Sequence, residues 1–153
     1  MLADWLELPG AADRIERWSQ LSGLDLARLG PPASAEEITD PAVTQPLVVA
    51  TALLAFGELA SRGLPATTVV AGHSVGEIAA YAIAGVISAD DAVTLASVRG
   101  AEMAKACAVE PTGMAAVLGG DENEVLARLE ALELIPANRN AAGQIVAAGA
   151  VEA

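Results

Sequence analysis

Basic and aromatic residues are both scarce in this chain of 153 residues. Lysine and arginine number 8 against 20 aspartates and glutamates, which gives a formal net charge of −12. Because the phosphates of nucleic acids require a basic protein face, this balance argues against a nucleic-acid partner. Aromatic residues make up only 3% of a chain that is 54% hydrophobic. The core must therefore be built from alanine, valine, leucine and isoleucine, and the length is sufficient for one.

Cysteine is represented by Cys107 alone, which excludes an internal disulfide framework and a thiol metal site. The longest apolar run, Pro46–Phe56, is shorter than the roughly 20 residues that span a bilayer, so it predicts a buried helix. No secretory signal pattern opens the sequence. We therefore expect a cytoplasmic protein with no membrane partner.

The stretch 69–80 has the strongest chemical signal in the sequence. An apolar, β-branched run over 67–71 predicts a strand, Gly72–Gly76 has the pattern Gly-x-Ser-x-Gly around Ser74, and a helical pattern follows. This order is typical of a nucleophile elbow with the serine at its tip. We expect both glycines to be required, because a Cβ at either position would crowd the turn. The alternative is a tight strand-to-helix connection in which Ser74 is only a cap.

Apolar periodicity and capping signals divide the rest of the chain into helices and strands. The predicted helices cover residues 11–21, 44–61, 75–84 and 88–108. The capping-box spacing of Ser34 and Glu37 predicts the start of a further short helix. Asp40-Pro41 is another helix-start signal. After Pro111 the patterns predict a strand over 113–118, a helix over 121–132 and strands over 135–138 and 144–148.

The order strand, helix, strand, strand after Pro111 is the front part of a ferredoxin-like unit. We therefore expect an α/β protein in two parts. Residues 1–111 would form a partial α/β-hydrolase-like core with the nucleophile elbow. Residues 112–153 would form the start of a ferredoxin-like α+β subdomain.

Arg99 occupies an unusual position in the predicted helix 88–108. Leu95, Arg99 and Met103 are spaced by four and share a stripe that is otherwise apolar. A guanidinium there needs an anionic partner, and arginine holds a carboxylate with two parallel hydrogen bonds. We expect Leu95 and Met103 to face the core and to turn Arg99 toward Ser74. The alternative is that Arg99 extends to solvent or pairs with Glu102.

His73 is the only histidine. A general base must come within about 2.6–3.2 Å of the Ser74 hydroxyl, which the residue immediately before it rarely can. We interpret His73 as a packing or hydrogen-bonding residue of the turn. The chain then offers a nucleophile without a histidine base, and serine is a weak nucleophile without one.

The combination of motifs resembles the malonyl-CoA:acyl-carrier-protein transacylases and the related acyltransferase domains of polyketide synthases. The matching stretches are Gln45-Pro46, Gly72–Glu77, Ala84–Val86, Arg99-Gly100 with Met103, Gly113-Met114 and Asn138–Gly149. The last stretch resembles the stand-alone enzyme of fatty acid synthesis more than the modular polyketide domains.

The resemblance implies acyl transfer in fatty acid biosynthesis, with malonyl-CoA and acyl carrier protein as partners and no bound cofactor or metal. Ser74 would take the malonyl group from malonyl-CoA and pass it to the phosphopantetheine thiol of the carrier. Arg99 would grip the free malonyl carboxylate, which implies that its guanidinium lies about 4–9 Å from the Ser74 hydroxyl. The backbone N–H of Val75 would donate to the oxyanion. The substrate-binding residues would also include His73, Asn138 and Asn140.

Two motifs of the family are not found in these 153 residues. One is a Gly-Gln-Gly-rich loop whose glutamine supplies a second oxyanion donor, and the other is a catalytic histidine in the second half. We therefore expect a transacylase fragment that lacks both ends, with little activity and with apolar side chains exposed along one flank of its sheet. The alternatives are a polyketide-type acyltransferase, a serine esterase of the α/β-hydrolase type, in which Arg99 has no role, and a non-catalytic remnant.

Overall fold

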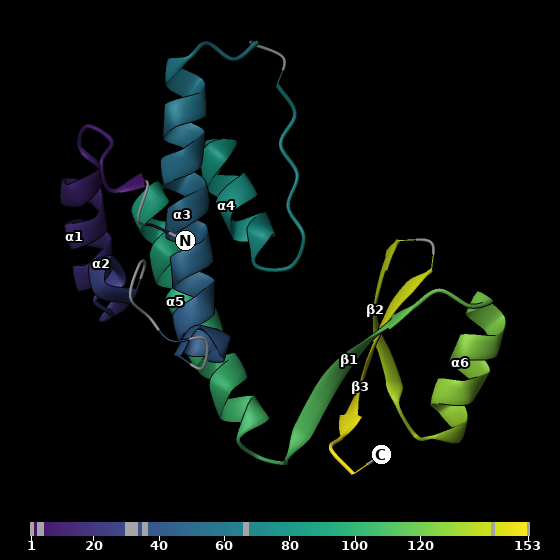
Figure 1. Ribbon diagram of the computed structural model, residues 1–153. Helices are drawn as coiled ribbons and strands as arrows, with labels where there is room; N and C mark the ends of the chain where they lie inside the picture. Colours follow the sequence, from purple (N-terminus) through teal and green to yellow (C-terminus); the bar gives the residue numbers. More distant parts are fainter. Residues whose placement is uncertain are drawn as a thin grey trace. The chain divides into compact units, whose positions relative to one another are not determined.

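The computed structural model describes residues 2, 5–29, 34, 37–65, 68–141 and 143–152. It has two compact units, Met1–Ala104 and Lys105–Ala153 (Figure 1). The first unit consists of helices and the second of a small antiparallel sheet with one helix, so the chain has an α/β fold. The boundary predicted from the sequence was 111/112, immediately before the first strand, whereas the compact units divide within the last turn of a long helix.

The helices of the first unit follow the sequence predictions closely. They are α1 (Ala11–Ser22), α2 (Leu26–Leu29), the short 3₁₀ helix η2 (Glu37–Thr39), α3 (Pro41–Ser61), α4 (Gly76–Ile83) and α5 (Ala89–Cys107). The capping box before η2 is confirmed, because Ser34 and Glu37 each accept a 3.1 Å hydrogen bond from the other's backbone N–H. Ser88 caps α5 by accepting a 3.0 Å hydrogen bond from the Asp91 N–H.

Helix α3 begins earlier than predicted. The Asp40 side chain accepts a 2.8 Å hydrogen bond from the Ala42 N–H, and Pro41 occupies the first helical position, where its fixed φ suits a helix. The prediction placed the start of the long helix at Thr44 and treated Asp40-Pro41 as a separate start signal. In the structure, Pro46 lies inside the helix.

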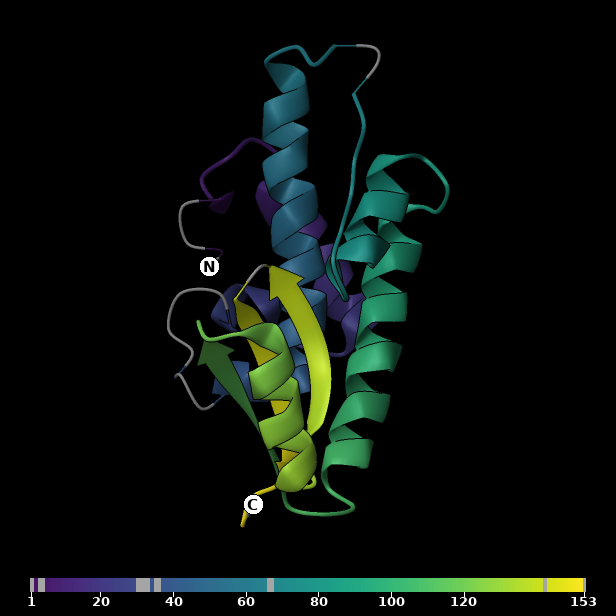
Figure 2. The same cartoon turned by 90° about the vertical axis from the view of Figure 1, so that its right-hand side faces the viewer.

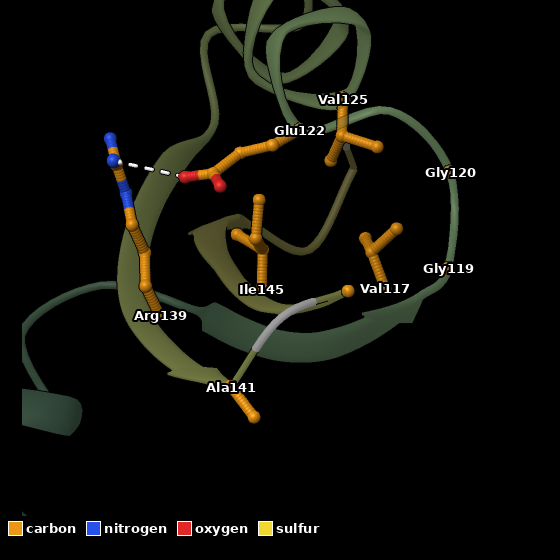
Figure 3. A pocket seen from close by; sticks show the side chains of 9 residues that line it. Val117, Gly119, Gly120, Glu122, Val125, Arg139, Ala141 and Ile145 are labelled. Carbon is orange, nitrogen blue, oxygen red and sulfur yellow. Dashed lines mark hydrogen bonds and ion pairs between the residues drawn. The ribbon is translucent and has the colours of Figure 1, made fainter.

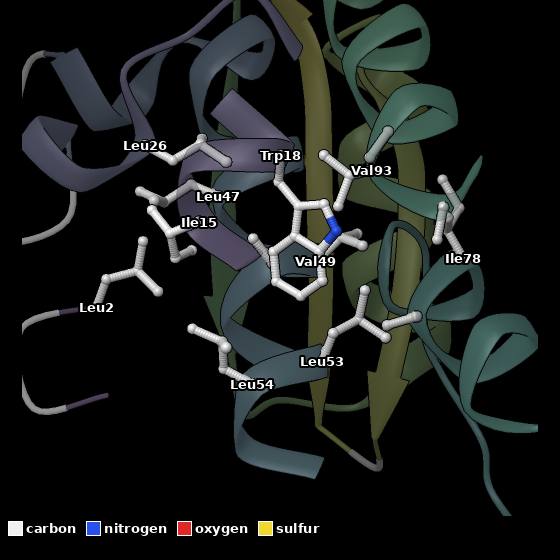
Figure 4. Packing of buried hydrophobic residues seen from close by; sticks show 14 of the residues in the cluster. Leu2, Ile15, Trp18, Leu26, Leu47, Val49, Leu53, Leu54, Ile78 and Val93 are labelled. Atoms are coloured by element: carbon white, nitrogen blue, oxygen red, sulfur yellow. The ribbon is translucent and has the colours of Figure 1, made fainter. Parts of the chain in front are cut away.

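Helix α3 is the core helix of the first unit. By length and composition, its 21 residues could cross a membrane, but the core helix of a soluble protein passes the same test. The apolar run Pro46–Phe56 therefore underestimated the length of the apolar helix. Helix α3 contacts α1, α4 and η2. Leu47, Val49 and Leu54 are fully buried in the cluster with Trp18 and other residues (Figure 4). This packing accounts for its apolar character.

The segment before α4 is not a strand, so the prediction of a strand over 67–71 is wrong for the described residues 68–71. Strands are held by hydrogen bonds to a neighbour, and no described residue pairs with this segment. It descends from the end of α3 to the start of α4 (Figures 1 and 2). With α3 and α4 it lines a groove of about 430 Å³. Val69 is 90% exposed, but the described residues form no sheet here whose flank could be uncovered in the way that the sequence had predicted.

The second unit is a three-stranded sheet covered by one helix. Its elements are β1 (Thr112–Leu118), α6 (Glu122–Ala131), β2 (Ile135–Ala141) and β3 (Gln144–Ala150). The strand order is β1-β3-β2 and both pairings are antiparallel, so β1 and β2 run parallel with β3 between them. Leu129 of α6 packs with Ile145 and Ala147 of β3, and α6 lies over one face of the sheet (Figure 2).

A small pocket of about 160 Å³ lies between the sheet and the start of α6 (Figure 3). Val117, Val125 and Ile145 supply its apolar lining. The Arg139 guanidinium donates to the Glu122 carboxylate at 3.1 Å, and both side chains are more than half exposed. The ion pair therefore joins β2 to α6 at the surface.

Asp90 ties α1 to α5 in the first unit. Its carboxylate accepts hydrogen bonds from Arg17 Nε at 2.6 Å and from Trp18 Nε1 at 3.1 Å. The hydrogen bond from Arg17 is the main reason that the pKa of Asp90 lies below its usual value. Partial burial opposes this effect, while Trp18 and the Arg17 charge add to it. The same contact raises the pKa of Arg17.

We expect Asp90→Asn to lower the free energy of unfolding at pH 7 by up to about 1 kcal/mol, because partial exposure screens the ion pair. A carboxylate with a depressed pKa stabilises the fold above its unfolded value of about 3.9 and loses this effect as the pH falls through the folded value. Urea unfolding from pH 7 to pH 2.5 should therefore show the variant and the parent converging in acid. A constant difference at every pH would contradict the assignment.

Candidate active site

Ser74 lies at the tip of a strained turn that leads into α4. Its φ is +55°, in the left-handed region that non-glycine residues rarely adopt. The turn is closed by hydrogen bonds from the Gly76 N–H to the His73 carbonyl at 3.0 Å and from the Glu77 N–H to the Ser74 carbonyl at 3.1 Å. The Ser74 residue is exposed. The predicted strained, exposed serine at the entry of the helix is confirmed.

The two glycines of the motif have different roles. A Cβ on Gly72 would lie 2.1 Å from the Gly76 carbonyl oxygen and 2.4 Å from the Glu77 nitrogen, so no side chain fits there. A Cβ on Gly76 would have no described atom within 4 Å, leaving out the backbone of its own helix. The expectation that both glycines are needed for space is therefore wrong for Gly76, because the chain folds back over Gly72 only.

The backbone N–H of Val75 lies beside the serine and is open to a ligand. The next N–H groups, those of Gly76, Glu77 and Ile78, all donate within the turn. Among the described residues no acceptor bonds to the Val75 N–H. Of these helix-start donors it is the one left to meet a developing oxyanion, which suits the role predicted for it.

Arg99 of α5 reaches the serine, but the buried face of α5 is not the predicted one. Its buried residues are Ala92, Val93, Ala96 and Gly100, whereas Leu95 is 49% and Met103 is 39% exposed. The expectation that Leu95 and Met103 face the core is therefore wrong. Small residues allow closer helix packing than leucine, and they form the buried face. A Cβ on Gly100 would lie 2.4 Å from the Pro41 carbonyl oxygen, so α5 approaches the start of α3 very closely.

The Arg99 guanidinium reaches Ser74 directly. Its Nη2 donates to the Ser74 Oγ at 3.2 Å, and its Nη1 donates to the Gln45 Oε1 at 2.5 Å. The distance to Ser74 is shorter than the expected 4–9 Å, since in this structure the hydroxyl itself accepts the hydrogen bond. Arg99 is half-buried, so the interpretation that it simply extends to solvent is wrong. The arrangement places the Ser74 hydroxyl and the Arg99 guanidinium in direct contact.

Gln45 was missed as a site residue by the sequence reasoning, which used it only as part of the family resemblance. It is 5% exposed and is the one buried polar residue among the described positions. The available signal was a single amide in a mostly apolar helix, because a buried amide requires hydrogen-bond partners.

The other predicted site residues lie apart from this contact or in the other unit. The His73 side chain is exposed and does not pack in the turn, whereas its carbonyl accepts the 3.0 Å hydrogen bond from the Gly76 N–H that closes the turn. Asn138 and Asn140 belong to β2 in the second unit, where the Asn140 Nδ2 donates to the Gln144 Oε1 at 3.0 Å. Their proximity to substrate stays a prediction. Within the described chain, no group of three or more His, Cys, Asp or Glu residues could hold a metal ion.

Comparison with known proteins gives consistent results over the whole chain. The profile of the acyl transferase domain family matches residues 11–153. A malonyl CoA-acyl carrier protein transacylase of Mycolicibacterium smegmatis is 80% identical over 154 residues, with 100% of this chain and 53% of the relative covered.

Solved structures show the same similarity. The crystal structure of the Mycobacterium tuberculosis protein named MCAT superposes with a TM-score of 0.92 at 72% identity, over 99% of this chain and 51% of that one. A malonyl-transacylase in complex with a type II polyketide acyl-carrier protein gives a TM-score of 0.88 at 30% identity, over 99% and 51%. The chain thus spans about half the length of the relatives it matches.

The two glycines of the turn provide a matched test of its geometry. We expect Gly72→Ala to lower the free energy of unfolding by more than about 2 kcal/mol, because its Cβ would meet backbone atoms that cannot move aside. Gly76→Ala should change it by less than about 1 kcal/mol, since alanine favours the helix and meets no described atom. Urea unfolding of both variants measures the difference. Equal losses would contradict the structure of this turn.

Proposed function

The chain belongs to the family of acyl transferase domains, and from this membership we propose that the protein is an acyl-carrier-protein S-malonyltransferase of fatty acid biosynthesis. It would move a malonyl group from malonyl-CoA to the phosphopantetheine thiol of an acyl carrier protein. The observation on which this rests is the 3.2 Å contact between Arg99 and the Ser74 hydroxyl. A nucleophile beside a fixed cation suits an acyl donor that ends in a carboxylate.

In the first step, the Ser74 Oγ attacks the malonyl thioester carbonyl and its proton passes to a base. The Val75 N–H donates to the oxyanion that forms. Collapse of this intermediate breaks the C–S bond, and coenzyme A leaves as the thiol after it takes a proton. In the second step the carrier thiol attacks the acyl-serine, and the Ser74 oxygen is released with its proton restored.

Arg99 would hold the malonyl carboxylate by charged hydrogen bonds throughout both steps. Arginine is suited to this because its planar guanidinium matches the two carboxylate oxygens. Without substrate, the Ser74 hydroxyl accepts the hydrogen bond that the carboxylate would take. A serine esterase with the same elbow has no need for a cation here, so the contact favours a malonyl-type substrate over that alternative.

We further propose the finer architecture that this family would have. Residues 1–111 would form part of an α/β-hydrolase-like core. Residues 112–153 would begin a ferredoxin-like subdomain, and the strand order β1-β3-β2 around α6 supports this. His73, Asn138 and Asn140 would line the substrate site. The protein would act in the cytoplasm without a bound cofactor.

The proposal can be tested in a full-length hybrid, in which these 153 residues replace the matching stretch of the Mycolicibacterium smegmatis relative. We expect Ser74→Ala to abolish malonyl transfer. Arg99→Ala should lower kcat/KM for malonyl-CoA at least about ten-fold more than for acetyl-CoA, because a hydrogen bond to a charged group is worth roughly 1.5–3 kcal/mol. Arg128→Ala, an exposed arginine of α6, is the matched control and should change neither. Equal losses for the two substrates would show that Arg99 has only a structural role.

A second prediction concerns the 153-residue chain by itself. We expect its rate of malonyl transfer to be at least about 100-fold below that of the hybrid, because loss of a single oxyanion donor typically lowers kcat by about 100- to 1,000-fold. In addition, its only histidine directly precedes Ser74 and is poorly placed to act as the base. Loading of carrier protein from labelled malonyl-CoA measures both proteins under the same conditions. Equal rates, abolished by Ser74→Ala, would mean that another group within the chain serves as the base.

A further inference from the structure

Gln45 is connected to the candidate active site through both ends of its amide. Its Oε1 accepts from Arg99 Nη1, and its Nε2 lies 2.9 Å from the Met103 sulfur, a weak acceptor. The side chain is 5% exposed on the second turn of α3. Burial of an amide is unfavourable unless it is hydrogen-bonded, so this contact with Arg99 compensates an otherwise unfavourable residue.

The chemistry of the two groups fixes how the amide is oriented. A guanidinium can only donate hydrogen bonds, so the amide oxygen must face Arg99 and the NH₂ group must face Met103. The guanidinium is then held at Nη1 by Gln45 while Nη2 points to the Ser74 Oγ. A planar group bonded at two nitrogens to partners on two different segments cannot rotate freely about its long side chain.

The packing of the helices places Gln45 within reach. Gly100, next to Arg99, lies against the backbone of Pro41 and Ala42. Gln45 follows about one turn later on the same helix. An apolar residue would fill this buried position of α3 without needing a partner, as its neighbours Leu47 and Val49 do.

We propose that Gln45 is a positioning residue for Arg99, which holds the guanidinium beside Ser74 and thereby sets the preference for acyl groups that carry a free carboxylate. The preference for the carboxylate rests on the proposed function, whereas the positioning of the guanidinium does not. Gln45 stays neutral, so the full charge of Arg99 is available to the substrate. A carboxylate at this position would hold the guanidinium equally well but would neutralise it.

The positioning can be tested without any turnover, by NMR of the arginine side chains in the 153-residue chain. The Arg99 signals are assigned by comparison with Arg99→Lys. We expect separate Nη–H signals for Arg99 in the parent chain, because rotation of the held guanidinium is slow, and one averaged signal in Gln45→Met. Gln45→Glu should keep them separate. Averaged signals in the parent chain, or separate signals in Gln45→Met, would overturn the proposal even if the protein were shown to transfer another acyl group.

The effect on substrate preference is measured in the full-length hybrid. Gln45→Met and Gln45→Glu should each lower kcat/KM for malonyl-CoA about ten-fold, mainly through KM, and leave acetyl-CoA within two-fold. Gln20→Met, the same substitution at an exposed position of α1, should change neither. Equal losses for both substrates would assign Gln45 a purely structural role and overturn the proposal, as would no loss at all. If a thermal melt shows that Gln45→Met does not fold, the result for Gln45→Glu alone tests the proposal. Glutamate retains the size of glutamine and an oxygen that can accept the hydrogen bond from Arg99.

Discussion

The close approach of α5 to the start of α3 is the constraint on which the candidate site depends. At Gly100 no side chain fits between the two helices, because the Pro41 carbonyl oxygen already occupies that space. The helices therefore meet backbone to backbone at this point. This contact brings the Arg99 side chain beside α3, where Gln45 accepts its hydrogen bond. A larger residue at position 100 would push α5 away and separate the cation from its partner.

Ser74 depends on a second close approach, within its own turn. The chain folds over Gly72 so tightly that a Cβ there would overlap the backbone of Gly76. The turn places Ser74 in a left-handed conformation that costs of order 1–3 kcal/mol. Helix α4 follows this turn, and its residues Ile78 and Ala79 are buried in the hydrophobic core of the unit. Their packing anchors α4 and compensates for the strain at Ser74. The strained residue is thus held by packing immediately after it.

The two close approaches together decide what chemistry the surface can perform. One presents a serine hydroxyl with an open N–H beside it at Val75, and the other presents a guanidinium within hydrogen-bonding distance of that hydroxyl. A serine alone would suit many esters and thioesters. A serine in contact with a fixed cation is compatible with the proposed preference for acyl groups that end in a carboxylate.

The sequence by itself determined the local features of this protein. Most helix limits, the capping box of Ser34 and Glu37 and the tight turn around Ser74 depend on residues a few positions apart, so their patterns were sufficient to predict them. The tertiary structure decided everything that depends on distant partners. Thr68, Val69 and Val70 have β-branched side chains, but no described strand lies beside them to pair with, and so they form no strand. Arg99 does contact Ser74, but Leu95 does not face the core. The buried face of α5 is instead the one at which Gly100 lies against the distant backbone of Pro41. This packing also brings Arg99 to Gln45.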